Sequence, residues 1–172
     1  MGTASDLVGA QTTVMTFSTE FADLYERHYA AVYRTAFRIT GNAADAEDVL
    51  QTVFLRVLNQ RGQPPVLAPE AYFRRAATNA ALDLLRRKTT HRETELDEAV
   101  SVYSGDHAAF LKERLRGALA AIDEADAVMF LLRYIEGMSN GELAEMFGQG
   151  KNNIAVRLHR IRQSLQAEME RP

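Results

Sequence analysis

The stretch from Gly137 to Leu165 constrains the fold most, because its sequence is typical of two short helices joined by a glycine turn. Ser139 and Glu142 have the spacing of a capping box, in which the hydroxyl and the carboxylate each accept a hydrogen bond from a backbone N–H near the helix start. Gly148 and Gly150 can adopt the positive φ that ends one helix and redirects the chain. Together these signals predict a helix-turn-helix.

The second of these helices combines an apolar stripe with a cationic surface. Its apolar residues recur at the spacing of one buried helix face, namely Ile154, Leu158, Ile161 and Leu165. Its basic residues are Lys151, Arg157, Arg160 and Arg162, with no acidic residue between them. A cationic helix above an apolar seam favours DNA binding, although the same pattern also fits a solvated surface helix of an ordinary bundle.

Composition sets wider bounds on the chain. With 172 residues and 47% hydrophobic content it can bury one core or two small ones. No apolar run approaches the roughly 20 residues that span a bilayer, and no basic residue precedes Arg27. We therefore expect a cytoplasmic protein without membrane insertion or a secretory signal.

Nothing in the sequence predicts catalysis, a cofactor or a metal site. The chain has no cysteine, and its four histidines are scattered without a Ser or Asp partner at a suitable spacing. There is no phosphate-binding glycine loop, and the carboxylate pairs fall at expected helix starts or in an acidic segment. An enzyme is therefore the weakest interpretation.

The net charge of −3 hides an uneven distribution. Basic residues dominate between Tyr72 and Arg92 and again in the last helix, whereas the segment 93–110 contains five acids and no Lys or Arg. Together with Ser104 and Gly105, this composition predicts a flexible acidic linker. We expect an all-α fold with two small helical domains, 17–92 and 111–172, and a disordered N-terminal tail, 1–16.

The sequence ahead of this linker is helical in pattern throughout. Apolar residues between Phe17 and Ile39 recur at spacings of three and four, which predicts one amphipathic helix with these side chains in the core. They are Phe21, Leu24, Tyr25, Tyr29, Val32, Tyr33 and Phe37. Gly41 and Asn42 end this helix, and Asn42 is a good N-cap for the next one.

The next predicted helix runs from Ala43 to about Asn59 and begins with acids, which the positive end of the helix dipole favours. Its expected apolar stripe is Val49, Leu50, Val53, Phe54, Val57 and Leu58. The opposite face carries Asp48, Gln51, Thr52, Leu55 and Arg56. That face fits either a solvated surface or a docking site for a partner.

A third helix is predicted from Pro69, because proline at a first helical position loses no hydrogen bond. Its expected buried side is Ala71, Tyr72, Ala76, Ala80, Leu84 and Leu85. Arginines are expected opposite, with Tyr72 and Phe73 as exposed rings near the helix start. Cations beside exposed rings suit unstacked bases, because cations attract phosphate and rings stack on bases.

Four segments, in family order and spacing, resemble a bacterial RNA polymerase sigma factor of the extracytoplasmic-function (ECF) group. They are DAEDVLQTVFLRV (45–57), PEAYFRRAATNAALDLLRRK (69–88), FLLRYIEGMSNGELAEMFG (130–148) and VRLHRIRQSL (156–165). The resemblance extends from about Phe17 to Glu170. It implies sigma regions 2 and 4 in the two domains, and promoter recognition without catalysis.

The resemblance also implies which residues contact each partner. The clamp helices of core RNA polymerase would contact Asp45, Glu47, Asp48, Gln51, Phe54 and Arg56. The minus-10 element would contact Tyr72, Arg74, Arg75, Asn79, Arg86 and Arg87, with a flipped base in the loop 60–68. The duplex minus-35 element would contact Lys151, Asn152, Asn153, Arg157, His159 and Arg160. An anti-sigma factor is the third implied partner, and the low net charge would let the two domains pack together.

Two neighbouring positions depart from the family pattern. Ala155 and Val156 stand where the family commonly has Lys or Arg followed by Ser, which removes hydrogen-bond donors from the helix that faces DNA. The segment 148–150 also lacks the usual central aliphatic residue. An alternative therefore stays open, in which the chain is a sigma-like decoy that binds a regulator or polymerase without recognising promoters.

Overall fold

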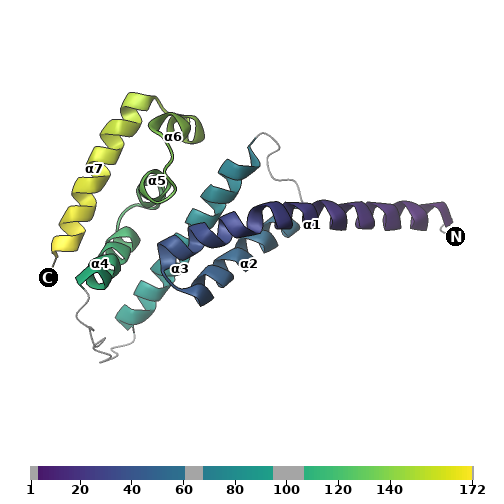
Figure 1. Ribbon diagram of the computed structural model, residues 1–172, viewed down its shortest axis with the longest axis horizontal. Helices are drawn as coiled ribbons and strands as arrows, with labels where there is room; N and C mark the ends of the chain where they lie inside the picture. The colour runs from purple at the N-terminus through teal and green to yellow at the C-terminus, as the bar shows by residue number, and fades with distance from the viewer. Residues whose placement is uncertain (1–3, 61–67, 95–106, 172) are drawn as a thin grey trace.

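The computed structural model describes residues 4–60, 68–94 and 107–171, and every regular element in these ranges is an α-helix. The helices are α1 (Ala4–Thr40), α2 (Ala43–Asn59), α3 (Pro69–Thr94), α4 (His107–Ala121), α5 (Glu124–Tyr134), α6 (Asn140–Phe147) and α7 (Lys151–Glu170) (Figure 1). Helices α1 to α3 pack as a first unit, and α4 to α7 pack as a second unit. The predicted all-α fold class is confirmed.

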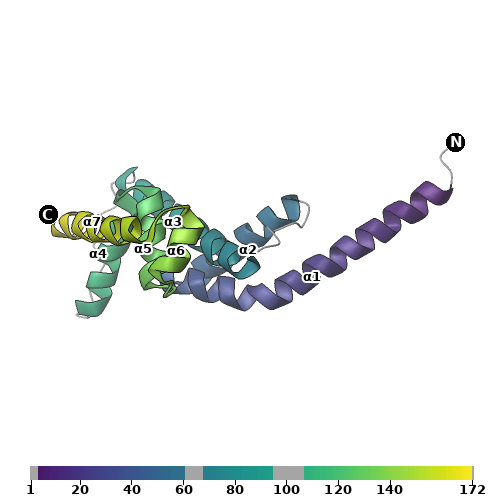
Figure 2. The ribbon, with the colours of Figure 1, turned by 90° about the horizontal axis from the view of Figure 1, so that it is seen from above.

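Two element bounds differ from the predicted domain limits. Helix α1 begins at Ala4, inside the segment 1–16 that was expected to be a disordered tail, and its N-terminal part extends beyond the other helices (Figure 2). No proline interrupts residues 4–40, and a helix that is already nucleated gains one hydrogen bond for each added residue. Helices α3 and α4 both reach into the predicted linker 93–110, of which residues 95–106 lie outside the described ranges.

The core of the first unit contains an aromatic cluster around Phe73. Phe73 is 1% exposed, and its ring lies 4.5 Å from that of His28 and 5.4 Å from that of Phe54. Burial lowers the pKa of His28, which favours the neutral ring that packs here. The prediction that Phe73 is exposed beside Tyr72 is therefore wrong.

The aromatic residues of α1 also differ from the prediction. Tyr25, Tyr29 and Phe37 are 38%, 46% and 44% exposed, and the first two stack on each other at 5.5 Å. The buried line of this helix runs through Val32, as predicted, and continues through Ala36 and Ile39. These smaller side chains let α2 and α3 approach closely, so the larger rings lie at the flank of the packed surface.

The local signals of the helix-turn-helix are confirmed. Ser139 and Glu142 form both hydrogen bonds of the capping box, and Gly148 ends α6 in the left-handed conformation with a φ of 62°. Gly150 differs, because it is extended, with a φ of −74°, at the start of α7. The stripe from Ile154 to Leu165 is buried as predicted.

The two units also contact each other, with α3 against α4 and α5. At one end of this interface, Arg116 of α4 donates a hydrogen bond from Nε to the carbonyl oxygen of Ile39, at 3.0 Å, in the last turn of α1. Nearby, Arg38 lies 3.5 Å from the carboxylate of Glu136. Cations near a helix C-terminus are favourable, because the terminal carbonyl groups carry partial negative charge.

Gly41→Ala is expected to destabilise the chain by about 1–2 kcal/mol, because Gly41 has a φ of 70° that an L side chain rarely adopts. The new Cβ would also lie 2.0 Å from Nη2 of Arg116 and displace that side chain from Ile39. Thermal unfolding measures this loss of stability. Because both changes disrupt the contact of Arg116 with Ile39, the destabilisation by Gly41→Ala combined with Arg116→Ala should be smaller than the sum of the two single effects. Gly117→Ala is the matched control, since a Cβ there meets nothing within 4 Å and should stabilise α4. Equal effects of the two glycine changes would contradict the prediction.

Candidate nucleic-acid interface

The start of α7 presents a polar and cationic surface. Its buried stripe packs against α4, α5 and α6 and thereby fixes which side chains face outward. The exposed residues of the first turns are Lys151, Asn152, Asn153, Ala155, Val156, His159 and Arg160. Five of the six predicted minus-35 residues therefore lie on one exposed surface, which we call the α7 face. The first acid of this helix is Glu168, far from that face.

Arg157 is the predicted minus-35 residue that lies elsewhere. Its Nε donates a hydrogen bond to Oδ1 of Asp126 on α5 at 2.6 Å, and each side chain is about a third exposed. This ion pair joins α7 to α5. The structure thus gives Arg157 a role in orienting α7, which spacing alone did not indicate.

The turn before α6 is held by the capping box of that helix. Oε2 of Glu142 accepts a hydrogen bond from the backbone N–H of Ser139 at 2.8 Å. The hydrogen bonds from Ser139 lower the pKa of Glu142, and the nearby Arg74 contributes a smaller lowering. At the next turn, Gly150 provides no side-chain cap, so the positive N-terminal end of α7 carries no neutralising group of its own.

The capping box makes stability depend on acid pH. The pKa of Glu142 is lower in the folded chain than in the unfolded chain. Ionised Glu142 therefore contributes to folding stability above the unfolded pKa, and this contribution is lost as the pH falls through the folded pKa. Glu142→Gln is expected to reduce the fall in melting temperature over that window, as measured by circular dichroism. Glu145→Gln, an exposed change on the same helix, is the control. An identical acid profile for wild type and Glu142→Gln would contradict this expectation.

The predicted minus-10 residues near the start of α3 face the second unit. Nη1 of Arg75 donates a hydrogen bond to the carbonyl oxygen of Met146 at 3.4 Å, and its guanidinium lies 5.0 Å from the ring centre of Phe147. Arg74 and Glu142 line a cleft of about 600 Å³ between α3 and α6. The helix-turn-helix therefore covers part of this surface in the closed arrangement of the two units.

Arg86 and Arg87 differ although they are neighbours. Arg86 donates from Nη2 to the carbonyl oxygen of Ile122 at 2.7 Å and lies 3.2 Å from Oε2 of Glu124, so it contacts the second unit. Arg87 is exposed and donates to the carbonyl oxygen of Asp83 in its own helix, at 3.3 Å. The charge of Arg86 is therefore partly neutralised by Glu124 of α5.

The remaining minus-10 residues lie near the gap in the described chain. Tyr72 is half-buried, and its hydroxyl donates a hydrogen bond to Oε1 of Gln60 at 3.5 Å. Asn79 is also half-buried, within α3. Of the loop 60–68 that was predicted to hold a flipped base, residues 61–67 lie outside the described ranges.

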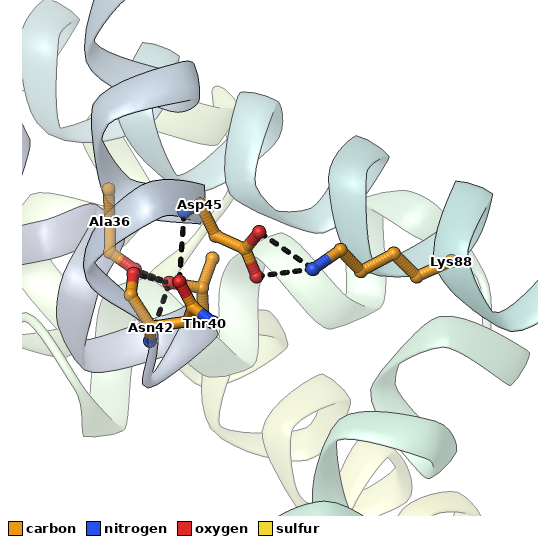
Figure 3. Close-up of polar contacts among 5 residues, drawn as sticks. All are labelled: Ala36, Thr40, Asn42, Asp45 and Lys88. Carbon is orange, nitrogen blue, oxygen red and sulfur yellow. Dashed lines mark hydrogen bonds and ion pairs between the residues drawn. The ribbon is translucent and has the colours of Figure 1, made fainter. Parts of the chain in front are cut away.

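Two of the predicted polymerase contacts are buried inside the first unit. Asp45 is 8% exposed, and its two carboxylate oxygens lie 2.6 and 2.7 Å from Nζ of Lys88 (Figure 3). The same view shows Asn42 accepting a hydrogen bond from the backbone N–H of Asp45, as predicted for the N-cap. Phe54 is 4% exposed in the aromatic cluster. Neither side chain has the free surface that a direct contact requires.

The other predicted polymerase contacts lie on the outside of α2. Glu47, Asp48 and Gln51 are exposed, and Nη2 of Arg56 lies 3.5 Å from the carboxylate of Asp83. Leu55 joins them, with 56% of its surface exposed. We call Asp48, Gln51 and Leu55 the α2 face, because their spacing places them on one side of the helix. That spacing was the signal that could have added Leu55 to the predicted contacts.

The second unit also has an apolar groove of about 560 Å³ between α4, α5 and α7. Phe110, Phe130, Tyr134 and Met169 line it, and Arg162 lies at its edge. Arg162 is thus exposed on the opposite side of α7 from Arg160. This difference makes it a useful reference cation on the same helix.

Within the described ranges, no group of three His, Cys, Asp or Glu residues is placed to hold a metal ion. Among the same residues, none of the helices has the length and apolar content needed to cross a bilayer. The exposed side chains of the α7 face are cations, amides and a few apolar groups.

Each of the two units matches a known protein family. Residues 24–91 match the family described as Sigma-70 region 2, and residues 112–165 match Sigma-70, region 4. The chain is 32% identical over 153 residues to the ECF RNA polymerase sigma factor SigE of Mycolicibacterium smegmatis, covering 83% of this chain and 59% of SigE. The chain thus spans about three fifths of the length of that relative.

Other relatives are matched over more of their length. The RNA polymerase sigma factor CarQ of Myxococcus xanthus is 31% identical over 146 residues, which cover 81% of this chain and 83% of CarQ. The ECF RNA polymerase sigma factor SigL of Mycobacterium tuberculosis is 30% identical, with 79% and 81% covered. A solved structure of CnrH in complex with the cytosolic domain of CnrY has 24% identity and a TM-score of 0.47, over 86% and 85% of the two chains. These relatives give no support to the decoy alternative.

Proposed function

Because the chain belongs to the ECF group of RNA polymerase sigma factors, which direct promoter recognition in transcription initiation, we propose that its two units bind the two promoter elements separately. The second unit binds the minus-35 element, and the first unit binds the minus-10 element and core RNA polymerase. The chain then acts by binding, without a reaction of its own. The observation that carries this proposal is the exposed α7 face, which presents cations and amides at the start of a capped helix-turn-helix.

The α7 face suits duplex DNA. In a helix-turn-helix, the N-terminal residues of the recognition helix contact base edges in the major groove. Asn152 and Asn153 can each bond an adenine edge through two hydrogen bonds, and Arg160 can bond guanine or phosphate. The ion pair of Arg157 with Asp126 supports this role, because it limits rotation of α7 against α5.

The α3 surface suits single-stranded DNA, with Arg74, Arg75, Arg86 and Arg87 for phosphates and Tyr72 for base stacking. Since Arg75 and Arg86 contact the second unit in the closed arrangement, DNA binding along α3 requires the units to move apart. The contacts that must break include partly exposed arginine interactions, which salt and a competing phosphate weaken.

The α2 face is the part of the first unit that we assign to core RNA polymerase. Leu55→Ala is expected to weaken core binding about tenfold, because burying a leucine side chain stabilises a contact by roughly 1.5–3 kcal/mol. The measurement is fluorescence anisotropy of the labelled chain titrated with core enzyme. Val156→Ala is the matched control, since it also truncates an exposed aliphatic residue but lies on α7. Unchanged core affinity for Leu55→Ala would remove the α2 face from this interface.

Transcription in vitro tests the proposed function as a whole. The purified chain is mixed with bacterial core RNA polymerase and a genomic fragment library, and the transcript starts are sequenced. Starts that share two spaced upstream motifs are the expected result. Core binding without defined starts would overturn the proposal in favour of a decoy. The same chain used as bait tests for the anti-sigma factor that the family resemblance implies.

A further inference from the structure

Val156 is an aliphatic residue in the middle of the polar α7 face. It is 53% exposed, and its neighbours one helical turn away on both sides are Asn152, Asn153, His159 and Arg160, all of them exposed. The adjacent Ala155 is exposed as well. A single exposed valine is ordinary on a protein surface. Val156 is different because the residues three and four positions away on either side are polar and are proposed to contact DNA.

The outward direction of Val156 is fixed by its surroundings. Ile154 and Leu158, two residues to either side, are 0% and 4% exposed in the core of the second unit. Between them, Arg157 is bound to Asp126 at 2.6 Å. Rotating α7 to bury Val156 would expose both core residues and break this ion pair. The valine therefore stays on the surface that approaches DNA.

The chemistry of the major groove gives such a side chain one specific partner. Among the four bases, only thymine presents an apolar group there, the C5-methyl, whereas the other edges present hydrogen-bond donors and acceptors. We propose that Val156 recognises the C5-methyl group of one thymine in the minus-35 element. The small side chain of Ala155 leaves room for that base pair beside the helix. This inference rests on the proposed binding of duplex DNA by α7.

Adjacent asparagines strengthen the choice of an A·T pair. Asn152 and Asn153 lie one turn before Val156 and offer the amide groups that pair with adenine. A face that combines these amides with an aliphatic side chain thus favours A·T-containing sequence over G·C. The loss of hydrogen-bond donors at positions 155 and 156 then changes base choice without abolishing DNA binding.

The test replaces thymine by uracil, which pairs identically and lacks only the methyl group. The chain is bound to core RNA polymerase, and its affinity is measured for a promoter found in the transcription experiment, with each thymine of the minus-35 duplex changed in turn on either strand. One change is expected to weaken wild-type binding about fourfold, the effect of losing one buried methyl-sized group. Val156→Ala should bind the thymine and uracil promoters equally.

Two controls keep the comparison specific. Val156→Thr retains one methyl group and the branched shape, so it should keep part of the preference for thymine. Gln163→Ala alters an exposed residue of α7 beyond its proposed DNA-contacting turns and should keep all of it. If wild type binds its promoter and tolerates uracil everywhere, or if Val156→Ala shows the same loss as wild type, the inference is overturned. If no specific promoter is found at all, the proposed function fails first and this inference with it.

Discussion

Arg86→Ala combined with Arg87→Ala is expected to weaken promoter binding by the polymerase-bound chain about tenfold or more, because hydrogen bonds to charged groups contribute roughly 1.5–3 kcal/mol each. The dependence of log affinity on log salt should flatten by the loss of about two phosphate contacts. Promoter-fragment binding measured across a salt series gives both quantities. An unchanged slope would remove these two arginines from the DNA surface.

In the free chain the two arginines should differ. Arg87 is exposed and available to phosphate, whereas Arg86 is occupied by Ile122 and Glu124 of the second unit. Glu124→Gln weakens that contact and is expected to raise the affinity of the free chain for single-stranded minus-10 DNA by about twofold to fivefold, the range of a partly exposed ion pair. Glu47→Gln removes the same charge from α2 and serves as the control. A gain of similar size in both variants would show a general charge effect instead of release of Arg86.

The features that could be predicted from the sequence depend on residues within one helical turn of each other. The capping box of Ser139 and Glu142, the N-cap at Asn42 and the left-handed turn at Gly148 all form bonds within four residues along the chain. The stripe of α7 also follows from spacing, because one helix face must be buried whichever helix covers it. Interactions between residues close in sequence are therefore sufficient to predict these features.

The features that were missed depend on which helices pack together. Lys88 is 43 residues from Asp45, and nothing near either residue indicates the ion pair that removes Asp45 from the surface. Phe73 and Tyr25 illustrate the same limit for burial, since a helix with apolar groups on more than half of its circumference can bury either side. The arrangement of α1 against α2 and α3 selects the side, and periodicity within α1 or α3 does not contain that information.

The four cations of α7 have different surroundings. Lys151 and Arg160 lie on the exposed α7 face, Arg157 is paired with Asp126, and Arg162 lies at the edge of the apolar groove. The sequence alone presents these four as equivalent members of one basic helix. Their different surroundings predict different effects of the same substitution to alanine. One cation of α7 can therefore serve as the control for another.

Lys151→Ala combined with Arg160→Ala is expected to reduce binding to duplex minus-35 DNA at least about tenfold and to lower the salt dependence by about two phosphate contacts. Arg162→Ala removes an identical charge from the groove side of α7 and should leave the salt dependence unchanged. Arg157→Ala should mainly lower the melting temperature, because it leaves Asp126 without its partner. An equal loss for each charge removed in the double variant and in Arg162→Ala would mean that only total charge matters, and the assignment of the α7 face to DNA would then be wrong.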